Sequence, residues 1–128
     1  MRRSLLFVLL VTLLFSCTED GNEVIANSQI ELENACTAEN PLAIGWMQDL
    51  KKELHCGEFS CEVSIIKSKY EGETVFYIQM TDPLCYGFDE ITLYSCTGKK
   101  IESFTIEESR EFVNSPGREI EEIFICND

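Results

Sequence analysis

Six cysteines spread between residues 36 and 126 constrain the fold of this chain more than any other feature. None are spaced as C-x-x-C and His55 is the only histidine, so the ligand spacing of a zinc site is absent. An even number of cysteines in an exported domain predicts a disulfide framework instead, with no metal. The candidates are Cys36, Cys56, Cys61, Cys85, Cys96 and Cys126.

The number of cysteines leaves the pairing open. We predict a bond between Cys85 and Cys96, because they flank a stretch of ten residues and the bond would close that short excursion.

The N-terminus has the layout of a signal peptide. Arg2 and Arg3 precede residues 5–15, eleven residues that are all apolar except Thr12. In a helix this stretch spans about 16 Å, which is too short for the ~30 Å hydrocarbon layer of a membrane. We therefore predict a cleaved export signal and not a membrane anchor.

Residues 14–17, with the sequence Leu-Phe-Ser-Cys, resemble the lipobox of bacterial lipoproteins. In that family the signal is cut before the cysteine, whose thiol receives a diacylglycerol and whose new amino group is acylated. The resemblance implies that residues 1–16 are removed and that Cys17 is the lipidation site. It also implies a palmitate-type anchor in the outer membrane of the cell envelope. An ordinary secreted protein with an incidental Cys17 is the alternative.

The charge of the mature chain bears on its partners. Removal of residues 1–16, which include Arg2 and Arg3, leaves 112 residues with 8 Lys and Arg against 23 Asp and Glu, a formal net charge of −15. This balance argues against nucleic acid and against electrostatic adhesion to anionic lipid. An acidic surface suits a basic protein partner, or it simply keeps a tethered protein soluble.

The composition predicts one domain behind a tether. Residues 17–35 contain the lipidated cysteine and a polar, acidic segment, and residues 36–128 form a single small domain. The tether has a reach of roughly 25 Å as a flexible coil. Its acidic residues 19–23 resemble the signal by which Bacteroidota export lipoproteins to the cell surface. Whether the protein faces the surface or the periplasm stays open.

The first ordered element is predicted to be a helix over residues 41–55. Asn40 is a good N-cap, Pro41 suits the first helical position, and apolar residues recur every three or four positions. Gly57 supplies a stop, and His55 at the helix end reads as a capping residue and not as a catalytic base.

Strands are predicted after Cys61, over residues 62–70, 74–81, 91–96 and 101–106, with a hairpin turn at residues 97–100. The second strand is apolar on both faces and is therefore expected to be central. In the first strand the apolar pattern changes phase between Ile65 and Ile66, which indicates a bulge or burial on both sides.

Two elements complete the predicted fold. Thr105 and Glu108 have the spacing of a capping box, so a helical turn is expected to run to Val113. Residues 120–126 suit a helix or a strand, and we favour an edge strand. The fold class is therefore α+β, an N-terminal helix packed on one face of a four- to five-stranded antiparallel sheet that disulfides staple.

From Cys61 onward the chain resembles a group of small uncharacterised lipoproteins from Bacteroidota. The shared pattern is Tyr-x-Gly-x-x-Val-aromatic-Tyr, followed by two cysteines that each stand near a glycine. It lies here at Tyr70, Gly72, Val75, Phe76, Tyr77, Cys85, Gly87, Cys96 and Gly98. The resemblance implies a single-domain exported protein and transfers no catalytic residue.

No constellation for catalysis or for a cofactor is present in the sequence. There is no G-x-S-x-G nucleophile elbow to accompany His55. Cys56 and Cys61 have four residues between them, whereas a thioredoxin-type redox site needs two. We therefore expect a protein that is not an enzyme, with no catalytic residue and no cofactor.

The remaining candidate site is the loop over residues 82–90. Pro83, Leu84, Tyr86 and Phe88 gather there beside Cys85, and exposed aromatic residues on a disulfide-held loop suit partner contact. The alternative is that these side chains close the end of the core. We expect a non-enzymatic binding or accessory module on the outer membrane, and the alternative function is an inhibitor of a hydrolase, either lysozyme or a protease.

Overall fold

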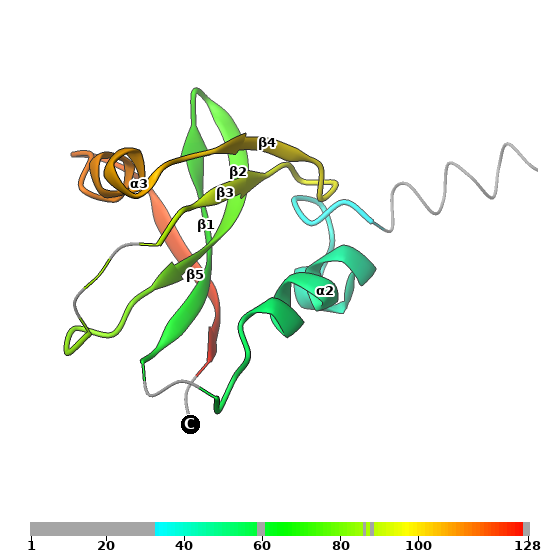
Figure 1. The fold of residues 1–128 in the computed structure, drawn as a ribbon. Helices are drawn as coiled ribbons and strands as arrows, with labels where there is room; N and C mark the ends of the chain where they lie inside the picture. The colour runs from blue at the N-terminus through cyan, green and yellow to red at the C-terminus, as the bar shows by residue number, and fades with distance from the viewer. Residues whose placement is uncertain (1–32, 59–60, 86, 88, 127–128) are drawn as a thin grey trace, which may run out of the picture.

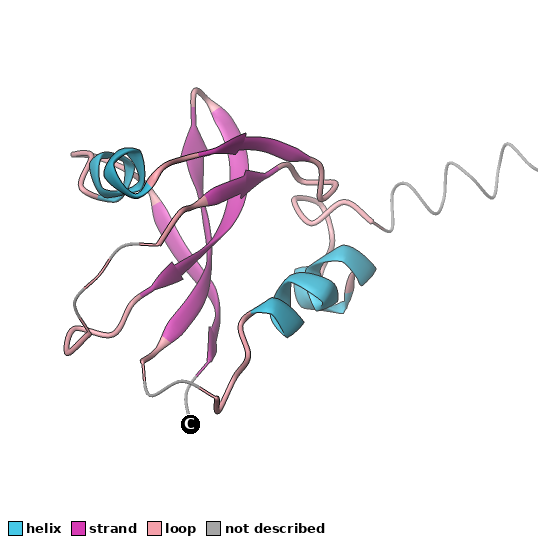
Figure 2. Cartoon of the chain, viewed as in Figure 1, coloured by secondary structure: helices cyan, strands magenta, loops and turns pink. Residues whose placement is uncertain are grey.

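The computed structural model describes residues 33–58, 61–85, 87 and 89–126. Within them five antiparallel strands form one sheet in the order β4-β3-β2-β1-β5, accompanied by two α-helices and a 3-10 helix (Figure 1, Figure 2). The elements are η1 (Pro41–Ala43), α2 (Gly45–Glu53), β1 (Val63–Tyr70), β2 (Glu73–Met80), β3 (Thr92–Tyr94), β4 (Lys100–Ser103), α3 (Ile106–Val113) and β5 (Ile120–Cys126). The predicted α+β class and antiparallel sheet are confirmed.

The β1–β2 hairpin is the centre of the sheet. A two-residue turn joins the strands, with Glu71 and Gly72 at φ +50° and +85°, as a tight right-twisted hairpin requires. As predicted, β2 is central and is buried on both faces, because Phe76 points to one side and Val75 and Tyr77 to the other.

Strand β5 lies at one edge of the sheet and pairs with β1, as predicted for residues 120–126. Ile65 pairs with Phe124 and Ile66 with Glu122, so the register shifts where the sequence indicated a bulge. Ile123 is the extra residue, and the shift lets both Ile123 and Phe124 pack against the core.

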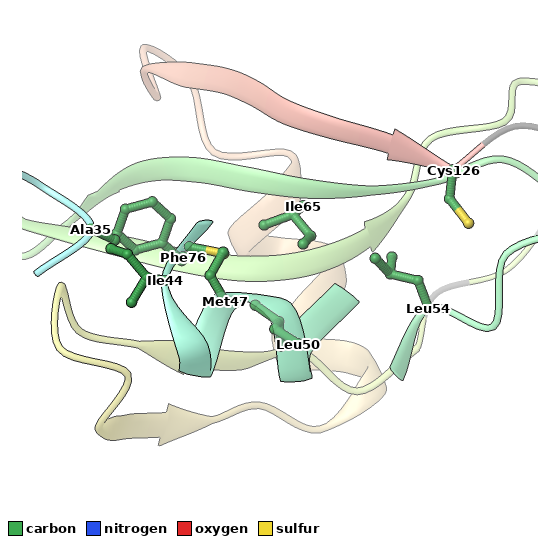
Figure 3. Packing of buried hydrophobic residues seen from close by; sticks show 8 residues of the cluster. All are labelled: Ala35, Ile44, Met47, Leu50, Leu54, Ile65, Phe76 and Cys126. Atoms are coloured by element: carbon green, nitrogen blue, oxygen red, sulfur yellow. The ribbon is translucent and has the colours of Figure 1, made fainter. Parts of the chain in front are cut away.

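Helix α2 covers one face of the sheet and forms the α2-side core with it (Figure 3). Met47, Leu50 and Leu54, spaced three or four apart, meet Ile65 of β1 and Phe76 of β2. The full buried cluster is Ala35, Ile44, Met47, Leu50, Leu54, Ile65, Phe76 and Cys126.

The single helix predicted over residues 41–55 is wrong in its first part. Asn40 does cap a helical turn, since its Oδ1 accepts from the Leu42 N–H at 3.2 Å, but that turn is the 3-10 helix η1. Ile44 is extended and only 5% exposed, and α2 begins after it at Gly45. The break turns the Ile44 side chain into the core. Helix α2 is also not N-terminal, because η1 and residues 33–40 precede it.

The helix ends through His55 and not through Gly57. His55 takes a positive φ of 49° directly after Leu54, the C-cap. A left-handed residue at this position ends a helix, and glycine is the usual choice there. His55 therefore lies at the helix end as predicted, while Gly57 serves the turn that follows.

The opposite face of the sheet is covered by α3, so the prediction of a single covered face is wrong. Its buried residues, the α3-side core, are Ile66, Val75, Tyr77, Ile91 and Leu93, with Tyr70, Phe104, Phe112 and Val113 packed against them. The buried Ser109 hydroxyl ties the helix to the sheet by accepting from the Ile91 N–H at 2.9 Å. Only two residues connect β4 to α3, so the helix lies directly over the sheet that β4 belongs to.

Aromatic rings and one cation fill the α3-side core. Phe112 lies within 5.2–5.9 Å of the rings of Phe104, Tyr77 and Tyr70. The Arg118 guanidinium stacks over Phe112 at 4.6 Å, and its three nitrogens are buried without a hydrogen-bond partner in the described residues. Burial raises the pKa of Tyr77, which Arg118 partly opposes.

The capping box at the start of α3 is confirmed. The Glu108 N–H donates to the Thr105 hydroxyl at 3.3 Å, and the Thr105 N–H donates to the Glu108 carboxylate at 2.8 Å. The Thr105 N–H and, at 2.9 Å, the Thr105 hydroxyl both donate to this carboxylate, and they hold the pKa of Glu108 below its usual value. Strand β3 ends earlier than predicted, because a turn already begins at Ser95, whose hydroxyl accepts from the N–H groups of Thr97 and Lys99. Strand β4 ends earlier than predicted, at Ser103, because Thr105 caps α3.

Three disulfides staple the domain, as the cysteine count predicted. Cys36 bonds with Cys96, Cys56 with Cys126, and Cys61 with Cys85. The predicted Cys85–Cys96 bond is therefore wrong.

The reason lies in the length of β2. Cys96 lies against the Thr74 carbonyl at the start of that strand, whereas Cys85 follows its end. A strand of this length separates the two by about 25 Å. Neighbours in the sequence thus lie at opposite ends of the sheet.

Ordered packing begins before the predicted domain boundary. Ala35, which we placed in the tether, is 3% exposed, and its N–H donates to the Cys96 carbonyl at 2.7 Å. The Trp46 indole also donates to the Glu33 carbonyl at 3.0 Å. The rest of the tether, Cys17 and the signal segment lie outside the described residues. No described helix combines the length and apolar character needed to cross a membrane.

Candidate functional site

The loop over residues 82–90 begins with a turn that Asp82 ties down. The Asp82 carboxylate accepts from the Leu84 N–H at 2.8 Å and from the Glu62 N–H at 3.2 Å. The Asp82 carbonyl accepts from the Cys85 N–H, and the Cys61–Cys85 bond links the turn to the start of β1. The start of this loop is thus fixed on three sides.

This turn exposes a large apolar side chain. Leu84 is 84% exposed, the largest exposure among the large hydrophobic residues that the structure describes, and Pro83 beside it is exposed too. The alternative in which Leu84 closes the end of the core is therefore wrong. Tyr86 and Phe88, the other two predicted contact residues, lie outside the described residues.

A cavity of about 210 Å³ lies beside the same loop, between the end of β2, the residues that lead into β3 and the end of α2. The cavity exists because β3 pairs with β2 at a single position, Phe76 with Tyr94. From this pair toward the end of β2, no further residues of the two strands pair. Its apolar wall consists of Val63, Ile78, Met80, Ile91 and Tyr94.

The rim of the cavity is acidic. Glu53 from α2 and Asp89 and Glu90 from the loop line it, and the described lining residues include no lysine, arginine or histidine. All three carboxylate residues are exposed and form no ion pair with the described residues. Burial raises the pKa of the Tyr94 hydroxyl, and the negative charge of Glu53 raises it further. The cavity therefore has a negative potential that suits a cation.

Other clusters offer less. Cys61, Asp82 and Cys85 bring three possible metal ligands together, but the two sulfurs are bonded to each other and offer no thiolate. His55 is exposed, and its Nδ1 lies 3.4 Å from the Glu58 carboxylate in the turn after α2. That contact joins neighbours within one turn and forms no pocket. The cavity and the Leu84 turn, which share the 82–90 loop, are thus the candidate site.

Sequence reasoning located half of this site. It identified the 82–90 loop and missed Glu53 and the open end of β2, which lie up to 37 residues away in the sequence. An acidic residue in the last turn of a helix is an unfavourable choice for the helix dipole, and this was the one local signal at Glu53.

Comparison with known proteins adds no relative. No family model, no curated protein and no solved structure matches this chain, so the resemblance to Bacteroidota lipoproteins stays a prediction.

Proposed function

We propose that this chain is an outer-membrane lipoprotein, anchored through Cys17, whose folded domain is a non-enzymatic module that binds a basic protein. The observation that carries the binding role is Leu84, 84% exposed on a turn that Asp82 and the Cys61–Cys85 bond hold in place. A preorganised apolar residue loses little conformational freedom when a partner covers it. Such residues are typical centres of protein interfaces.

The charge of the molecule supports a basic partner. The formal net charge of the chain is −13, and three of its exposed carboxylates lie around the cavity that the same loop lines. Complementary charge speeds association and disfavours acidic partners. A basic hydrolase such as lysozyme meets the same description, so the inhibitor function is one outcome of the test below.

The test is photo-crosslinking of the full chain in its native cells. A benzophenone amino acid at position 84 is expected to capture one protein with a basic surface, whereas the same group at Ile101, 44% exposed on β4, is expected to capture none. The purified partner should bind a Leu84→Ala variant at least about tenfold more weakly than the unchanged protein. Inhibition of that partner's hydrolase activity would select the inhibitor function. Equal capture at both positions, or none at 84, would overturn the proposal.

Lipidation has a separate test. Cys17→Ala should abolish labelling by an azido fatty acid and release the protein from membranes, while Cys17 in the unchanged chain is labelled. Labelling that survives in the variant would rule out this anchor.

A further inference from the structure

The backbone at the end of β2 faces the cavity. The Thr81 N–H donates to the Glu62 carbonyl at 3.0 Å and therefore points toward the β1 side. Because successive residues of a strand point their backbone groups to alternate sides, those of Ile78 and Met80 point to the β3 side. The pairing of Phe76 with Tyr94 on that side agrees with this alternation.

No described strand pairs with Ile78 or Met80 on this side. Continuing the register from Phe76 and Tyr94 would set Thr92 opposite Ile78, yet that pair is not formed. Ile78, Met80 and Thr92 instead line the cavity. The backbone carbonyls of the two β2 residues are thus available as acceptors at its wall.

Three carboxylates add to these acceptors at the rim of the cavity. Glu53 comes from α2, and Asp89 and Glu90 come from the loop that leads into β3. Together with the backbone carbonyls of Ile78 and Met80, these carboxylates make the site rich in acceptors, so a ligand that fits it must bring donors.

The size of the cavity limits that ligand. Its volume of about 210 Å³ is below the range of about 300–1,000 Å³ typical of small-molecule sites and holds roughly one long side chain. The apolar wall of Val63, Ile78 and Met80 suits a methylene stem, and the acidic rim suits a charged head.

We propose that this cavity binds one arginine side chain of the partner, with the guanidinium donating to the rim carboxylates and to the β2 carbonyls. Guanidinium carries five donors and no acceptor, and it keeps its charge when partly desolvated. This inference rests on the proposed binding function and names the chemistry that the site recognises.

The test uses the full chain in detergent and a capped Gly-Arg-Gly peptide as the probe, followed by the amide NMR signals of the protein. Signals of Ile78, Met80 and Thr92 are expected to shift with the arginine peptide. The same peptide with citrulline, which has the shape of arginine without its charge, is expected to bind at least about fivefold more weakly.

Matched variants place the site. Glu53→Gln and Glu90→Gln should each weaken binding of the arginine peptide about threefold to fivefold. Glu102→Gln removes the same charge from an exposed position on β4 and should leave binding unchanged. Because all three positions are exposed, the variants are expected to fold alike.

Two results would overturn the inference: equal binding of the arginine and citrulline peptides, or shifts that map away from β2. Its failure is separable from that of the proposed function. Crosslinking at position 84 without selective arginine binding would reject only the cavity's role. Selective arginine binding without capture at 84 would reject the Leu84 contact.

Discussion

The two faces of the sheet are held together by different means. On the α2 side, Cys36–Cys96 and Cys56–Cys126 tie down the chain before and after the helix. No disulfide of the described residues lies at α3, where a capping box, a buried hydroxyl and a cluster of aromatic rings hold the helix.

The difference follows from how each helix is connected. Helix α3 leaves β4 after two residues and leads into β5 after six, so its position over the sheet is set by short connections. The α2 segment precedes the whole sheet, and its bonds join residues 60 and 70 positions apart. Closing loops of this length costs conformational entropy, and a covalent bond removes that cost from folding. The two disulfides of the α2 side therefore hold segments that are far apart in the sequence, whereas α3 is held by short connections and by packing.

The largest effect is expected from the Cys56–Cys126 bond. The double substitution Cys56→Ala and Cys126→Ala should lower the free energy of unfolding by about 4 kcal/mol, because the bond closes a long loop. Urea unfolding followed by the fluorescence of Trp46, the only tryptophan, measures this loss. Removing Cys61–Cys85, with a separation of 24 residues, should cost about 1 kcal/mol less. An equal or greater loss there would contradict the loop-length argument.

On the α3 side the aromatic cluster should dominate. Phe112→Ala removes a ring that contacts three others and should cost about 3 kcal/mol, whereas Phe112→Leu keeps part of the contact and should cost about 1 kcal/mol. Denaturant unfolding of both variants gives the two values. The exposed neighbour Glu111→Ala is the control and should stay within about 0.5 kcal/mol of the unchanged protein. A loss for Phe112→Ala no larger than the control's would show that α3 is not held by this ring.

A substitution at Gly98 tests a single contact on the α2 side, the one with Trp46. Its φ is +78°, and an added Cβ would lie 2.5 Å from Cγ of Trp46. Gly98→Ala should therefore cost about 2 kcal/mol and shift the Trp46 emission.

Gly117→Ala is the matched control for this contact, because φ there is +75° but no atom lies within 4 Å of the added Cβ. It should cost only about 1 kcal/mol, the conformational part. Equal losses of stability in the two variants would mean that Trp46 moves away from the added Cβ at no cost.

The cap of α3 should have a smaller effect. Thr105→Ala removes the hydroxyl that accepts from the Glu108 N–H and should cost about 1 kcal/mol.

The lowered pKa of Glu108 adds a pH dependence to the stability of the fold. The stability that the ionised Glu108 carboxylate contributes is present above the ordinary carboxyl pKa and is lost as the pH falls through the pKa of the folded state. Melting temperatures from about pH 6 to about pH 3 should fall less steeply for Glu108→Gln. Parallel curves for the two proteins would contradict this.

Arg118 should matter least. Its guanidinium is buried without a hydrogen-bond partner in the described residues, so the desolvation cost offsets most of the attraction to Phe112 and Tyr77. Arg118→Met keeps the apolar stem and should change stability by less than about 1 kcal/mol in either direction. Calorimetric unfolding is the measurement, and a loss above about 2 kcal/mol would show that the cation is essential to this face.

Local pattern was sufficient for much of the fold. Apolar residues on both faces predicted β2 as a central strand, the Ile65–Ile66 phase change predicted the bulge, and Thr105 with Glu108 predicted the cap. Each of these depends on residues a few positions apart, so the sequence carries the necessary information. The 82–90 loop was identified for the same reason.

What the sequence by itself determined is thus the set of elements, the number of disulfides and one loop of the site. Only the tertiary structure decided the cysteine pairing, because Cys85 and Cys96 are separated by the length of β2. It also decided that α3 covers the second face and that Glu53 joins Asp89 and Glu90 around one cavity. These features depend on how the strands order in the sheet, and that order follows from burying both faces at once and from no single segment.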